Sequence, residues 1–159
     1  MSENSMKRII VALLLVTVVI SVYILAVDNI LWTYNPSHAY GLILFMVVDL
    51  LLIGIVLRRP RLASYLTMIW GGLQFVLMIG DAATGLGLGA DTGYSFRYLF
   101  FGEGNPSGLA TSLLLVVYVV IGLISLFEVV TLRRAASRPS EVTGSPQPAL
   151  KQNGRRPSV

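Results

Sequence analysis

The sequence predicts an all-α integral membrane protein: a bundle of four transmembrane helices with both termini in the cytoplasm, a long outer loop between helices three and four, and a disordered C-terminal tail. Of the 159 residues, 55% are hydrophobic and only 13% are charged, whereas soluble domains carry about a quarter charged residues. Four apolar stretches reach the roughly 17–25 residues that a helix needs to cross a bilayer. The Lys and Arg residues gather in the segments on one side of the membrane. In membrane proteins the side with this excess of basic residues is the cytoplasmic side.

The four predicted spans share length and apolar character, and they cover residues 9–27, 39–57, 62–83 and 109–132. Many of their residues are β-branched, which favours strands in water, but a backbone in lipid must satisfy its own hydrogen bonds, which favours helices at these lengths. Lys7 and Arg8 before the first span also fit a signal peptide, yet the apolar run is long for a signal core, so an uncleaved anchor is favoured. Residues 35–37 and 105–107 both read Asn-Pro-Ser, a helix-start pattern with Asn as N-cap and Pro in the first turn.

The charge pattern predicts how the chain is threaded. Eleven of its twelve Lys and Arg residues fall on the side that holds both termini and the turn between spans two and three, and Arg97 is the exception. We therefore expect a cell-membrane protein with cytoplasmic termini. Residues 1–8 form the N-terminal segment and residues 9–132 the transmembrane domain. Residues 133–159 are rich in Pro, Ser and Arg and cannot bury enough apolar surface to offset the entropy of ordering, which predicts a disordered basic cytoplasmic tail.

Polar residues inside the spans point to a candidate intramembrane site. Asp49 lies near the middle of the second span, about 13 Å from the cytoplasmic boundary at 1.5 Å per residue. No Lys or Arg is available at that depth, so we expect Asp49 to be protonated or held by hydroxyl and amide donors. The candidate set is Asp49, Thr17, Gln74, Ser125 and Tyr118. Hydrogen bonding between helices is the favoured interpretation, and a proton path or small-ligand cavity centred on Asp49 is the alternative.

The outer loop, residues 84–108, is the second candidate site. Aromatic residues alternate there with other types, a period of two that is typical of an extended segment at the membrane interface. The candidate docking residues are Tyr94, Phe96, Arg97, Tyr98 and Phe100. Because loops longer than about 12–15 residues are usually functional or disordered, we expect this loop to contact a partner.

Several kinds of chemistry are not expected. With no Cys and a single His, His38, the chain cannot by itself build a Cys/His zinc site, an iron–sulfur site, a bis-His haem site or a Cys nucleophile. The outer acids match no ligand spacing with His38 and are expected to be solvated loop residues; these acids are Asp28, Asp81, Asp91 and Glu103. His38, near the first turn of the second span, is expected to be a capping or interfacial residue. Glu128, near the cytoplasmic edge, is expected to reach water or arginine. No catalytic residue, metal or cofactor is predicted, and no basic stripe interleaved with aromatics indicates nucleic-acid binding.

Three functions fit these observations. The favoured one is a non-catalytic accessory or assembly subunit of a larger membrane complex, with the bilayer and other membrane subunits, or further copies of itself, as partners. The first alternative is a small oligomeric proton-coupled transporter that uses Asp49. The second is a membrane enzyme that acts on a lipid or quinone.

Overall fold

The computed structural model describes residues 3–34, 36–84 and 107–137 of the chain. Its helices are α1 (Glu3–Val27), α2 (Asn29–Tyr34), α3 (Pro36–Arg58), α4 (Pro60–Thr84) and α6 (Gly108–Ala136). Within these three ranges there is no strand. Four of the helices, α1, α3, α4 and α6, are long and apolar enough to cross a membrane, as predicted. The short helix α2 was not anticipated, and α6 continues four residues past the predicted end of the fourth span.

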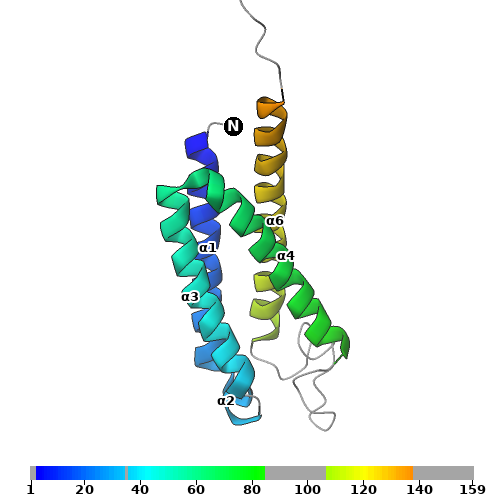
Figure 1. Ribbon diagram of the computed structural model, residues 1–159. Helices are drawn as coiled ribbons and strands as arrows, with labels where there is room; N and C mark the ends of the chain where they lie inside the picture. The colour runs from blue at the N-terminus through cyan, green and yellow to red at the C-terminus, as the bar shows by residue number, and fades with distance from the viewer. Residues whose placement is uncertain (1–2, 35, 85–106, 138–159) are drawn as a thin grey trace, which may run out of the picture.

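The four long helices run alternately in opposite directions along one bundle (Figure 1). The start of α1, the α3–α4 turn and the end of α6 lie together, and α2 lies at the other end (Figure 1). We call the first of these the basic end, after Arg58, Arg59, Arg61, Arg133 and Arg134. Helix α1 packs against α3 and α6, and α4 packs against the same two helices. The helices therefore form a ring in which α1 lies across the centre from α4, and α3 lies across from α6.

The junction of α1 and α2 is set by Asp28. Its backbone N–H donates to the carbonyl of Ile24 at 3.0 Å, which closes α1. Its carboxyl oxygen Oδ1 accepts the N–H of Leu31 at 3.0 Å, which caps α2. An aspartate in this position satisfies one of the free N–H groups at a helix start, so the chain can turn here without leaving that donor unpaired.

Proline and serine mark the other helix starts. Pro36 begins α3 and Pro60 begins α4, where the missing proline N–H removes no helical hydrogen bond. At the start of α6 the N-cap is Ser107, and its hydroxyl makes no capping bond. The predicted caps Asn35 and Asn105 lie outside the described residues.

Helices α4 and α6 touch through their backbones. A Cβ atom added to Gly71 would lie 2.7 Å from the carbonyl oxygen of Tyr118 and 2.8 Å from the amide nitrogen of Gly122, too close for any side chain. Lipid tails are as apolar as leucine, so close approach at small residues replaces hydrophobic burial as a source of helix association in membranes. The buried residues of α4 recur at steps of three or four, which places them on one face of the helix, and they include Ala63, Thr67, Gly71 and Gln74.

Candidate functional site

Asp49 occupies the centre of the bundle. Its side chain is fully buried, with 0% of its surface exposed. The indole N–H of Trp70 donates to Oδ1 at 2.7 Å, and the hydroxyls of Thr17 and Tyr118 lie 2.6 and 2.8 Å from Oδ2. These partners come from α4, α1 and α6, so one carboxyl group on α3 is bonded to each of the other three long helices. We call Asp49, Thr17, Trp70 and Tyr118 the central cluster.

The hydroxyl of Thr17 shows that two hydrogen arrangements satisfy the cluster. Its Oγ1 lies 2.6 Å from Asp49 and also 2.7 Å from the carbonyl oxygen of Leu14. A hydroxyl has one hydrogen to donate and can also accept. When Thr17 donates to Asp49, the carboxylate accepts three bonds; when Thr17 donates to Leu14, a protonated Asp49 donates to Thr17. None of the four predicted spans contains Lys or Arg, so the hydrogen bonds of the cluster stand in place of an ion pair.

An aromatic contact holds the indole of Trp70 in place. The rings of Trp70 and Phe45 pack edge to face, with centroids 5.6 Å apart and an interplanar angle of 80°. Phe45 lies one helical turn from Asp49 on α3. Edge-to-face packing is a favourable geometry for aromatic pairs, so this contact orients the ring whose N–H reaches the carboxyl group.

The predicted intramembrane residues separate into three groups. Thr17 and Tyr118 lie against Asp49. Ser125 is buried but lies 2.7 Å from the hydroxyl of Thr67 instead, an independent bond between α6 and α4. Gln74 is also fully buried, and within the described part of the chain neither atom of its amide group has a hydrogen-bond partner.

Trp70 is the member of the central cluster that the sequence reasoning missed. It lies three residues after Thr67 and four before Gln74, the spacing that keeps residues on one face of a helix. Tryptophan in a span is readily counted as apolar, yet its indole N–H is a donor that needs a partner when buried. The position of Trp70 on the same helix face as Thr67 and Gln74, together with its indole N–H donor, could have identified it from the sequence.

Two further acids are buried at opposite ends of the bundle. Asp28 is 4% exposed and accepts the hydroxyl of Ser107 at 2.6 Å, which joins the α1–α2 junction to the start of α6. The expectation that Asp28 is a solvated loop acid was wrong, because α6 begins directly beside it. Toward the basic end, Glu128 accepts the hydroxyl of Ser64 at 2.7 Å. The sequence did not predict this partner, which reaches Glu128 because α4 packs closely on α6.

The remaining predicted residues lie beyond what the structure describes. The docking residues of the outer loop, Tyr94, Phe96, Arg97, Tyr98 and Phe100, fall in residues 85–106, and residues 138–159 of the predicted tail are likewise outside the described ranges. Among the residues that are described, no group of three or more His, Asp or Glu side chains is placed to hold a metal ion. No family model, no curated protein and no solved structure matches this chain.

Proposed function

We propose that this protein is a non-catalytic accessory or assembly subunit of a larger complex in the cell membrane. The observation that carries the proposal is the hydrogen bonding of Asp49, the residue best suited to chemistry inside the bundle. Both of its carboxyl oxygens are occupied by donors from the other three long helices. A carboxyl group used in this way fixes the positions of four helices relative to one another, so the bundle offers its outer surface to partners.

Helix α3 supplies the docking face in this proposal. In its spanning window 17% of the residues are buried inside the bundle, against 28–39% for the other three spanning helices. Its outward stripe is apolar and exposed and consists of Tyr40, Leu44, Val47 and Leu51. The outer loop, residues 84–108, extends the contact surface beyond the membrane.

Site-specific photo-crosslinking in intact cells tests the docking face. We expect a crosslinkable residue at Leu44 or Leu51 to give one discrete adduct with a different membrane protein, which also co-purifies at fixed stoichiometry after mild detergent extraction. Val19 on α1, which is 67% exposed, is the matched control and should give little of that adduct. Adducts only with a second copy, or equal yields at all three positions, would contradict the proposal.

The proposed orientation places the basic end in the cytoplasm. It is supported by the excess of Lys and Arg at that end. Because the chain has no cysteine, single cysteines can be introduced without background. Ser5→Cys and Ser137→Cys should be protected from an impermeant thiol reagent in intact cells, whereas Ser95→Cys should react. Labelling of the two terminal positions on opposite sides would refute the orientation.

A proton-coupled transporter is the second candidate. It is favoured by the buried acids at three depths, Asp28, Asp49 and Glu128, each bonded to a hydroxyl group. Asp49→Asn separates the two functions, because asparagine can keep the hydrogen bonds of the cluster but cannot release a proton. Proton flux into liposomes that the wild-type protein supports and Asp49→Asn abolishes would favour the transporter, whereas an intact complex with no flux in either protein favours the subunit.

A further inference from the structure

A groove opens between α4 and α6 on the outside of the bundle. It has a volume of about 260 Å³ and is lined by apolar residues of both helices: Met68, Gly72 and Phe75 on α4, and Val119, Leu123 and Leu126 on α6. The hollow exists because a side chain is missing at Gly72, where an added Cβ would meet no atom within 4 Å. Its floor is the contact between Gly71 and Gly122, which also line it.

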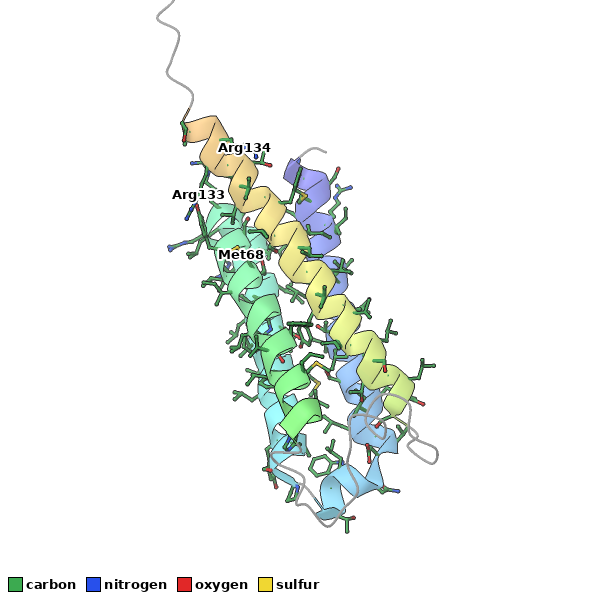
Figure 2. All side chains as sticks on the ribbon, turned by 90° about the vertical axis from the view of Figure 1, so that its right-hand side faces the viewer. Met68, Arg133 and Arg134 are labelled. Atoms are coloured by element: carbon green, nitrogen blue, oxygen red, sulfur yellow. The ribbon has the colours of Figure 1, made fainter. Side chains whose placement is uncertain are left out.

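The groove leads toward positive charge at the basic end. The guanidinium of Arg133 on α6 lies over the ring of Tyr65 on α4, 6.0 Å from its centroid. Figure 2 shows Arg133 nearer the basic end than Met68, which lines the groove. Spacings of four and three residues place Arg61, Tyr65 and Met68 on one face of α4, and both arginines are exposed. One exposed arginine on each of the two helices therefore lies between the groove and the basic end, on the face of its helix that lines the groove.

We propose that this groove binds one acyl chain of an anionic phospholipid whose phosphate lies between Arg61 and Arg133. The volume is below the roughly 300–1,000 Å³ of pockets for drug-sized ligands, which favours a slender apolar chain. Leu126 and Arg133 are separated by about 10 Å along α6, which leaves room for the glycerol and ester groups between chain and phosphate. Arginine is well suited to phosphate because its planar guanidinium can donate two parallel hydrogen bonds.

Charge also argues against a second copy of this chain in the groove. Two copies in one membrane share the same orientation, so packing groove against groove would bring Arg61 and Arg133 of both copies together at the same depth. Like charges placed opposite one another at an interface are unfavourable. An anionic headgroup neutralises the same cluster, so it is the better occupant.

Native mass spectrometry of the full-length protein in mild detergent tests the site, with phosphatidylglycerol and phosphatidylcholine of identical acyl chains as probes. We expect one tightly retained lipid and a preference for phosphatidylglycerol. Arg133→Gln should lower the affinity for phosphatidylglycerol about fivefold, the contribution of one basic residue near a lipid surface, and should lower that for phosphatidylcholine less, because the choline cation offsets the charge of its phosphate. Arg61→Gln should act in the same direction.

Filling the groove gives an independent readout. Gly72→Leu should abolish retention of both lipids. Gly54→Leu is the matched control, since Gly54 is an exposed α3 glycine whose added Cβ also meets no atom within 4 Å; it should retain both lipids. Equal binding by the two leucine variants would overturn the proposal, as would equal affinity for the two lipids in the wild-type protein. A monomer produced from a wild-type dimer by Gly72→Leu would assign the groove to a second copy instead. Because the arginine variants change only exposed side chains, they test the site even where a leucine variant fails to fold.

Discussion

Replacing Asp49 with alanine removes the carboxyl group on which three interhelical contacts meet. Thr17 keeps a partner, because its hydroxyl also lies 2.7 Å from the carbonyl oxygen of Leu14. The hydroxyl of Tyr118, whose side chain is 0% exposed, and the indole N–H of Trp70 lose the acceptor that holds them. Hydrogen bonds between membrane helices contribute about 0.6 kcal/mol on average and up to about 1.7 kcal/mol, so three of them predict a loss of about 2 kcal/mol and at most about 5 kcal/mol.

Asparagine is the control for this substitution because it can keep the same contacts. Its carbonyl oxygen can accept the indole N–H of Trp70, and its amide group can donate to the oxygens of Thr17 and Tyr118, since hydroxyl groups accept as well as donate. Asp49→Asn should therefore lose no more than about 0.6 kcal/mol, the average value of one such bond.

Reversible unfolding in mixed micelles measures both variants. Helix content is followed by circular dichroism as the fraction of denaturing detergent is raised. Thr131→Ala provides a second control, because its exposed hydroxyl bonds only to the carbonyl of Phe127 on its own helix among the described contacts. If Asp49→Ala unfolds like the wild-type protein, the central cluster does not hold the helices together. If Asp49→Asn is destabilised as much as Asp49→Ala, the charge and not the hydrogen bonds carries the stability.

Three further predictions concern other contacts of the bundle. Gly71→Ala should lower the free energy of unfolding by about 1–3 kcal/mol, the usual cost of overpacking. Gly72→Ala is the control and should not lower it, because an added Cβ there meets open space. The same detergent titration compares the two variants. Gln74→Met should raise the free energy of unfolding by about 1 kcal/mol, because it removes a buried amide without partners in the described residues, and a loss of stability would show that the amide is bound. Ser107→Ala should speed amide hydrogen exchange in the first turn of α6, because it breaks the contact to Asp28; unchanged exchange would contradict that role.

The sequence by itself determined that four helices of spanning length form, and roughly where they begin and end. This follows because a backbone in lipid has to satisfy its own hydrogen bonds, so length and apolar composition leave little choice. It also singled out Asp49, because an acid in the middle of a span is costly and needs partners. Depth along each helix could be read from residue spacing at 1.5 Å per residue.

Only the tertiary structure decided which side chains meet. Ser125 was predicted to belong to the same site as Asp49, yet it bonds to Thr67, because the depth of a residue says nothing about how its helix is rotated and tilted against its neighbours. The rotation and tilt of α4 against α3 likewise bring Trp70 to Asp49. The burial of Asp28 depends on the start of α6, 79 residues further along the chain, lying against the end of α1. Rotation, tilt and long-range neighbours are set by the packing of whole helices against one another, and local spacing in one chain does not contain them.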